Sequence, residues 1–171
     1  MLSGSFCHRI LLTGILLCGM SVHSSAQQTI ADVFREMPDS LLPTISENNR
    51  LDMIDYMASG MKAEVTNRLG GSSEMTTLTN DSLCVRVSQA QTVTLLLLTP
   101  AEYVDSCRQI VCMVRTYGID ESSLHTTVDY YTPQWVRILD KPLLCDADIR
   151  RIKNLDLQTI LNWRCETLKK D

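Results

Sequence analysis

The residues best suited to covalent chemistry are one histidine and two cysteines in the second half of the chain. His125 precedes Asp129 by four positions, and Cys107 precedes Cys112 by five. Four extended residues cover about 13 Å, so His125 and Asp129 cannot share a hydrogen bond within one strand. Cys107 and Cys112 would point to opposite faces of a strand that held both, and their spacing is not that of a Cys-x-x-Cys redox motif. We expect a surface histidine, unreactive thiols and no catalytic residue.

Acidic residues gather at two places where they could bind a cation. Glu47, Asp52 and Asp55 lie along one expected helix, and Asp146 and Asp148 flank a second expected helix start. Paired carboxylates can ligate calcium or share a proton. A solvated helix face explains the first group, and a helix start explains the second, because the glycine and glutamate of a calcium-binding loop are missing. We therefore expect no metal site and no cofactor site.

Short motifs add little. Asn80-Asp81-Ser82 has the form of a glycosylation sequon, but we favour a turn before the strand that contains Leu83 as the reason for it. The chain contains no Gly-x-Gly-x-x-Gly motif, no phosphate-binding loop and no nucleophile elbow.

Composition excludes several classes of protein. The chain has 171 residues, 44% of them apolar, with 16 basic and 20 acidic side chains. These values are not those of a disordered polymer or a polytopic membrane protein. The acidic balance and the lack of a basic cluster also argue against nucleic acid as a partner.

The N-terminus has the form of a secretory signal peptide. Arg9 precedes an uncharged run over residues 10–22, and Ser24-Ser25-Ala26 supplies the small residues of a cleavage site before Gln27. The run is too short to span a membrane, which takes about 20 residues. We expect residues 1–26 to be removed, leaving residues 27–171 as one exported domain without a transmembrane span, periplasmic or associated with the outer membrane.

The N-terminal segment is also compatible with two alternatives to cleavage. The segment could stay as an uncleaved anchor, or Cys18 could carry a lipid, although the bulky Leu17 before it does not fit a lipoprotein signal. Loss of the segment would also remove His8 and His23, so that a zinc site made of several histidines is impossible within one mature chain.

Five cysteines remain after the predicted cleavage, an odd number. In an oxidising compartment at most two disulfides can form among them, and their pairing is open. We favour the alternative that they are small apolar core residues. The five are Cys84, Cys107, Cys112, Cys145 and Cys165.

Apolar spacing predicts two helices at the start of the mature chain. One covers residues 29–37 and ends at Pro38. The second begins with Ser46 as its N-cap, and Gly70-Gly71 is expected to end the helical third of the chain. The expected buried face of the second helix consists of Leu51, Ile54, Met57, Ala58 and Met61.

Alternating apolar residues predict strands between residues 74 and 139. Short connections favour an antiparallel meander, with a hairpin loop at residues 118–122. After Leu139 we expect a short helix over residues 146–154 followed by extended structure. The expected strands contain Leu83 to Val87, Val93 to Leu97, residues 109–117, residues 124–131 and Trp135 to Leu139.

Several segments resemble those of a known family, most specifically over the N-terminal half of the resemblance. The segments are residues 32–43 (DVFREMPDSLLP), 47–55 (ENNRLDMID), 61–67 (MKAEVTN), 78–81 (LTND) and 109–118 (QIVCMVRTYG). The chain resembles the secreted Bacteroidales family known as domain of unknown function 3256 over about residues 29–139, and less so after Leu139. The resemblance implies export from a Gram-negative cell. It implies no activity, ligand or catalytic residue.

We therefore expect an α+β fold with N-terminal helices packed on an antiparallel β-meander of about five to seven strands. Leu95 to Leu98 put apolar side chains on both faces of one strand, so both faces need cover, from the chain itself or from a partner. The function favoured is a non-enzymatic binding module whose partner is an envelope protein or an apolar small molecule. Alternatives are an envelope assembly subunit, an acyl-chain carrier and, last, a hydrolase that pairs Cys107 or Cys112 with His125.

Overall fold

Two capped helices open the part of the chain that the computed structural model describes, which is residues 28–119 and 123–155. In α1 (Ile30–Arg35), the Thr29 side chain accepts a hydrogen bond from the Asp32 backbone N–H, and the Asp32 carboxylate accepts one from the Thr29 backbone N–H. A short 3-10 turn, η1 (Asp39–Leu41), leads to α2 (Glu47–Ala58), which Ser46 caps as predicted. Capping residues of this kind satisfy backbone N–H groups that a helix leaves free at its start.

The buried face of α2 differs from the one predicted. Arg50, Met53 and Ile54 are buried, whereas Leu51 and Met61 are exposed and Ala58 also lies on the surface. The apolar spacing misleads because an arginine takes one of the inward positions, where its two terminal guanidinium nitrogens donate to backbone carbonyls. Met61 lies beyond the end of the helix.

Within residues 28–119 and 123–155, seven strands form one antiparallel sheet in sequence order, which confirms the predicted meander. The sheet starts earlier than predicted, because a strand precedes Gly70-Gly71 and these glycines lie in a hairpin turn, not at a helix end. Gly70 has φ +78°, a conformation that glycine adopts at little cost. The strands are β1 (Ala63–Thr66), β2 (Ser72–Leu78), β3 (Ser82–Ser88), β4 (Gln91–Leu98), β5 (Ile110–Tyr117), β6 (His125–Tyr131) and β7 (Arg137–Ile138).

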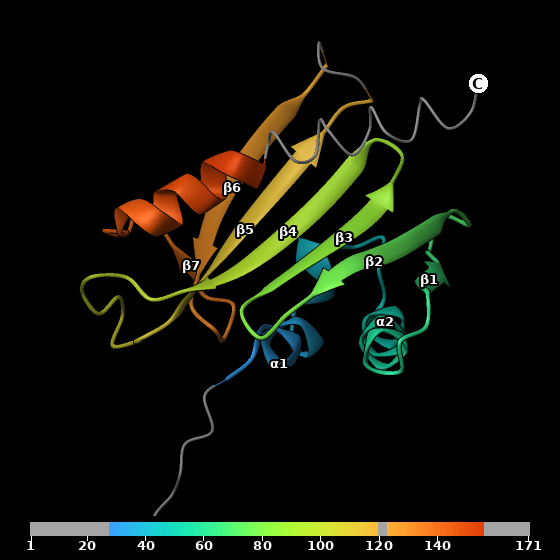
Figure 1. Cartoon of the computed structure of the whole chain (residues 1–171), viewed down its shortest axis with the longest axis horizontal. Coiled ribbons are helices and arrows are strands. Elements are labelled where there is room, and N and C mark those ends of the chain that lie inside the picture. The colour runs from blue at the N-terminus through green and yellow to red at the C-terminus, as the bar shows by residue number, and fades with distance from the viewer. Residues whose placement is uncertain (1–27, 120–122, 156–171) are drawn as a thin grey trace, which may run out of the picture.

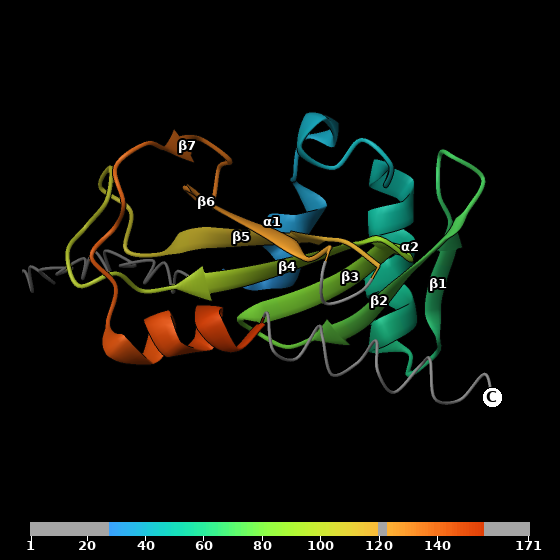
Figure 2. The same ribbon diagram turned by 90° about the horizontal axis from the view of Figure 1, so that it is seen from above.

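Helices cover both faces of this sheet. α1 and α2 pack on one face, against the main core. Residues 146–155 form a helix, which we call the C-terminal helix, that packs on the other face and lies below the strands in Figure 2. The latter helix agrees with the prediction for residues 146–154, and the extended structure expected after it lies outside the described residues. No helix within residues 28–119 and 123–155 combines the length and the apolarity needed to cross a membrane.

The Leu95 to Leu98 run is covered on both faces by the chain itself. Leu95 and Leu97 belong to the main core with α1 and α2. Leu96 and Leu98 belong to a smaller core, against which Ile152 of the C-terminal helix packs. The alternation of strand side chains produces this division, because neighbours along a strand point to opposite faces. The second face nevertheless has the thinner cover, and this is where an open groove lies.

Candidate functional site

The residues with catalytic chemistry are not brought together. His125 is exposed at the start of β6 and is paired with Tyr117 of β5. Asp129 accepts hydrogen bonds from Arg115 at 2.6 Å and from Arg137 at 2.7 Å. Its carboxylate is therefore engaged by two guanidinium groups and lies four positions along the strand from the imidazole.

Cys107 lies outside β5, whereas Cys112 lies within it, so the two cysteines do not share a strand. It closes a tight turn in which Val104 and Cys107 exchange backbone hydrogen bonds, and Asp105 and Ser106 between them have positive φ. Cys112 lies opposite Tyr130, five register positions from the pair that contains His125. Five positions correspond to about 16 Å, too far for an imidazole to take the proton of that thiol.

The surroundings of Cys112 make its thiol unreactive. Its side chain is completely buried, and burial raises the pKa of its thiol to about 12, with the nearby Asp148 and Asp129 carboxylates adding to the effect. A thiol reacts as its thiolate, which is scarce four pH units below the pKa.

We expect iodoacetamide at pH 8 to leave Cys112 unmodified in the folded protein while it alkylates the exposed Cys145. Peptide mass spectrometry of the treated protein measures both, and unfolding in guanidinium before treatment provides the control in which both react. Alkylation of Cys112 at a rate similar to that of Cys145 would contradict this account of its burial.

The acidic residues singled out in the sequence serve ordinary roles. Glu47, Asp52 and Asp55 are all exposed on α2. Asp148 lies at the start of the C-terminal helix, where its backbone N–H donates to the Cys145 sulfur at 3.5 Å. Within the described residues, no cluster of three or more histidine, cysteine or acidic side chains could hold a metal ion.

Two other sequence features are resolved in part. Asn80 lies in the turn between β2 and β3, and its carbonyl accepts a hydrogen bond from the Ile30 backbone at 2.9 Å, so this turn positions α1. Four of the five cysteines fall within the described residues and are free thiols: Cys84, Cys107, Cys112 and Cys145. Cys165 and the predicted signal peptide lie outside the described residues.

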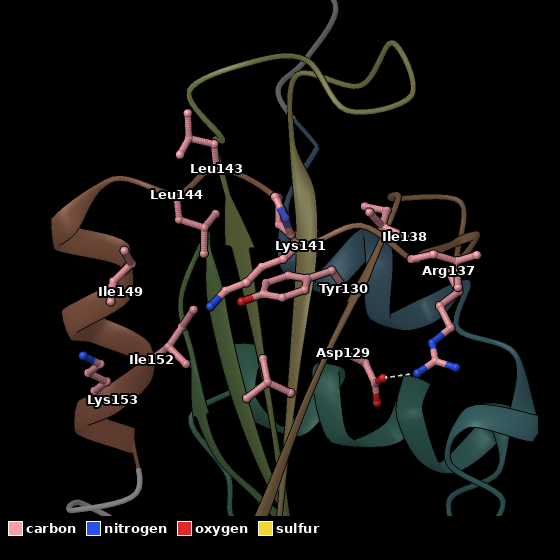
Figure 3. Close-up of a pocket in the computed structure, with 13 residues that line it drawn as sticks. Asp129, Tyr130, Arg137, Ile138, Lys141, Leu143, Leu144, Ile149, Ile152 and Lys153 are labelled. Atoms are coloured by element: carbon pink, nitrogen blue, oxygen red, sulfur yellow. Dashed lines mark hydrogen bonds and ion pairs between the residues drawn. The ribbon is translucent and has the colours of Figure 1, made fainter.

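An open groove of about 870 Å³ lies between the C-terminal helix and the β6–β7 end of the sheet. We call it the β6 groove (Figure 3). Tyr130 points from β6 toward the helix, which contributes Ile149 and Ile152. The groove is lined by Val128, Asp129, Tyr130, Arg137, Ile138, Leu139, Lys141, Pro142, Leu143, Leu144, Ile149, Ile152 and Lys153.

Apolar side chains remain exposed around this groove. Leu139 is 86% exposed and Leu143 64%, and Val128 and Ile149 each keep more than a third of their surface in contact with solvent. Single exposed apolar residues are common, whereas several along one groove mark a binding surface more often than a random surface feature.

The charges of the groove differ in sign from those of the whole chain. Arg137, Lys141 and Lys153 line it together with a single carboxylate, that of Asp129, whereas the chain as a whole has a net charge of −4. Burial raises the pKa of the Tyr130 hydroxyl to about 12, so this group stays protonated and able to donate a hydrogen bond at neutral pH. The groove therefore offers an apolar floor with cationic groups and one hydroxyl, a suitable combination for an acidic ligand with apolar parts.

Sequence motifs do not predict this site. Its lining comes from β6, β7, the 139–145 segment and the C-terminal helix, and none of these has a motif of its own. One sequence feature points to the site. The segment from Ile138 to Leu144 contains four apolar residues around Lys141 and Pro142, and a linker that only faced solvent would not need them.

Comparisons with known proteins give a family and a fold. A family model described as "Protein of unknown function (DUF3256)" matches residues 22–159, so the match continues well past Leu139, where the sequence suggested a weaker resemblance. A solved domain of an uncharacterized protein from Porphyromonas gingivalis W83 is 21% identical with a TM-score of 0.51, covering 64% of this chain. The aligned part is 53% of that solved chain, so this protein corresponds to about half of it. No curated protein matches this chain.

Proposed function

The chain belongs to the DUF3256 family, whose description assigns no activity, and from that premise we propose that it is an exported, non-enzymatic binding module whose ligand-binding site is the β6 groove. The observation that carries the proposal is the combination of exposed apolar side chains and cations in one open groove on an acidic chain. Its ligand is a partner protein of the cell envelope, bound through a segment with apolar and acidic residues.

The non-enzymatic part of the proposal is supported by the positions of the reactive groups. The Cys112 thiol is buried and protonated, and Asp129 is held by Arg115 and Arg137. A thiol hydrolase needs a thiol and an imidazole in hydrogen-bond reach, with a third group that orients the ring. Among the described residues, the register of β5 and β6 keeps Cys112 and His125 apart.

A matched pair of substitutions tests the groove. Ile149→Arg places a charge on the groove wall at a residue that is 38% exposed, and Leu69→Arg places the same charge on the β1–β2 hairpin at a residue that is 80% exposed. Each variant is expressed with an affinity tag in the native host, and the proteins that co-purify are quantified by mass spectrometry.

We expect one envelope partner to be enriched with the wild-type protein and the Leu69→Arg control, and to fall at least about tenfold with Ile149→Arg. Circular dichroism of the purified variants confirms that both are folded. An unchanged set of co-purifying proteins in folded Ile149→Arg would overturn the proposal that the groove is the site.

A small amphiphilic carboxylate is the second candidate ligand. The volume of the groove lies within the range of small-molecule sites, which is about 300 to 1,000 Å³, and cations next to an apolar floor suit a fatty acid. Native mass spectrometry of the protein purified from its own envelope distinguishes the two ligands. Added mass that organic extraction removes favours the fatty acid, and a ligand-free protein favours the partner segment.

Export is proposed from the N-terminal sequence. Cleavage after Ala26 is expected to leave Gln27 as the first residue of protein isolated from the envelope fraction, which N-terminal peptide mass spectrometry determines. Detection of an intact Met1 in that fraction would indicate an uncleaved anchor, and a lipid on Cys18 would indicate a lipoprotein.

A further inference from the structure

Two polar side chains of the β6 groove have no partner in the part of the chain that the structure describes. Among the charged residues that line the groove, Arg137 and Asp129 are paired with each other at 2.7 Å. Within residues 28–119 and 123–155, by contrast, Lys141 forms no ion pair and the Tyr130 hydroxyl forms no hydrogen bond. An ammonium group and a hydroxyl are therefore available to a ligand.

The fold directs both groups into the same space. Tyr130 lies on β6 between Cys112 of β5 and Ile138 of β7, so the sheet fixes the base of its side chain. Figure 3 shows the tyrosine ring and the Lys141 side chain extending from the sheet side of the groove toward the C-terminal helix. Because the pKa of the Tyr130 hydroxyl is raised to about 12, the hydroxyl remains a hydrogen-bond donor at neutral pH. The groove thus presents two donors, one of them charged.

The backbone that carries Lys141 is held in place. Pro142 follows it directly and is buried, and a proline restricts both its own φ and the conformation of the residue before it. The next residue, Leu143, accepts a hydrogen bond at its carbonyl from the Ala101 N–H at 3.0 Å. Less backbone freedom is therefore lost when Lys141 binds a ligand, which favours affinity.

Apolar side chains lie beside the two donors. Leu144 and Ile152 pack on the smaller core, whereas Val128 and Ile149 remain 39% and 38% exposed. A small ion would leave these exposed side chains in water, and a purely apolar ligand would cover the donors without pairing them, which costs free energy. The groove therefore favours a ligand in which an acceptor group is attached to an apolar group.

From this arrangement we infer that Lys141 and Tyr130 form a carboxylate-binding subsite within the β6 groove. Two donors, of which one is charged, match the two oxygens and the single charge of a carboxylate. The inference rests on the proposed function and specifies its ligand. The carboxylate is an aspartate or glutamate side chain of the partner segment, and an adjacent apolar residue of that segment packs against Val128 and Ile149.

Hexanoate and hexanamide test the subsite, because they share an apolar chain and only hexanoate has a carboxylate. Each is titrated at constant ionic strength into the purified protein labelled with ¹³C, and binding is followed by NMR. We expect a dissociation constant on the order of 10 mM for hexanoate, and binding of hexanamide that is at least about fivefold weaker. Hexanoate should shift the signals of the Tyr130 ring and the Lys141 side chain. Equal affinities for the two compounds would overturn the subsite.

Three variants locate the carboxylate. Lys141→Met removes the ammonium group, Tyr130→Phe removes the hydroxyl, and Lys62→Met removes a lysine that is 65% exposed at the β1 edge of the sheet. We expect the dissociation constant of hexanoate to rise about threefold in each of the first two variants and at least about eightfold in their combination. It should change less than about 1.5-fold in Lys62→Met. Equal losses in Lys141→Met and Lys62→Met would indicate general attraction to positive charge and would overturn the subsite.

Carbodiimide coupling identifies the source of the carboxylate. This reagent joins a lysine amine to a carboxylate in contact with it, so treatment of cell envelopes records what is bound at Lys141. Peptide mass spectrometry should find Lys141 linked to an aspartate or glutamate of a second protein. A fatty acyl amide on Lys141 would assign the carboxylate to a free fatty acid and overturn the partner segment. The absence of any coupled product at Lys141 would overturn occupancy of the subsite in the envelope.

The outcomes separate this inference from the proposed function. If Ile149→Arg loses the native partner and the combined Lys141→Met and Tyr130→Phe variant retains it, the groove remains the binding site and the subsite is overturned. If hexanoate binds at Lys141 and Ile149→Arg retains every co-purifying protein, the subsite stands and the proposed partner is overturned.

Discussion

Substitution of Trp135 by alanine is expected to lower the free energy of unfolding by roughly 4 kcal/mol, the amount typical of a large aromatic side chain removed from a core. Trp135 is buried in the main core and stacks against Tyr131 with 5.5 Å between ring centroids. Its indole N–H donates to the Val33 carbonyl at 2.9 Å. It thereby ties the β6–β7 connection to a helix about a hundred residues earlier in the chain.

The hydrogen bond matters because Val33 lies in the last turn of α1. The Met37 N–H bonds to the Phe34 carbonyl, not to that of Val33, so the indole supplies a donor that the helix lacks. The packing also compensates for the backbone conformation of Trp135, whose φ of +65° is unfavourable for a bulky residue.

Guanidinium denaturation followed by far-ultraviolet circular dichroism measures the loss. Trp135→Phe is the control, because it keeps an aromatic ring and removes the hydrogen bond, and it should cost only about 1 to 2 kcal/mol. A loss below about 1 kcal/mol for Trp135→Ala would show that the β6–β7 connection does not hold α1 in place.

Substitution of Arg50 by methionine is the second large effect, with an expected loss of roughly 3 kcal/mol. The Arg50 side chain is 2% exposed and donates to the Met37 carbonyl at 2.7 Å, the Ile45 carbonyl at 3.1 Å and the Asp39 carboxylate at 2.9 Å. Methionine fills similar space but leaves both carbonyls without this donor. The chain between α1 and α2 would then lose the group that holds it in its conformation.

The control for Arg50 is its exposed acidic partner. Asp39→Asn keeps a hydrogen-bond acceptor and removes a charge that is 40% exposed, so it should destabilise the protein much less than Arg50→Met does. Arg50 and Arg68 lower the pKa of Asp39, so this ion pair persists at neutral pH and weakens only in acid. If the free energy of unfolding of Arg50→Met equalled that of the wild type, the two carbonyls would have to find other donors.

The parts of the fold with a strong local signal could be predicted. Ser46 with its capping pattern, and the alternation of Leu83, Val85 and Val87, locate α2 and β3 because these features arise within a single element. β1 has only four residues, too few for a clear alternation, and Gly70-Gly71 indicates a turn without stating which elements it joins.

Features that depend on distant contacts could not be predicted. Arg50 is buried only because the η1 region supplies carbonyls, and Trp135 is fixed by Val33 far away in the sequence. The β6 groove has the same origin, since it exists only once the C-terminal helix packs on the second face of the sheet. The apolar run of β4 predicts that other residues must pack on this face of the sheet. It does not predict that Val128 stays partly exposed there.

Site-specific photo-crosslinking in living cells shows whether a partner protein occupies the β6 groove. A photoreactive phenylalanine derivative replaces Leu143, which lines the groove and is 64% exposed, or Leu69, which lies at the opposite edge of the sheet and is 80% exposed. We expect a discrete protein adduct from position 143 that is lost when Ile149→Arg is added, and no adduct from position 69. Equal adducts at both positions, or no adduct at position 143, would contradict this expectation.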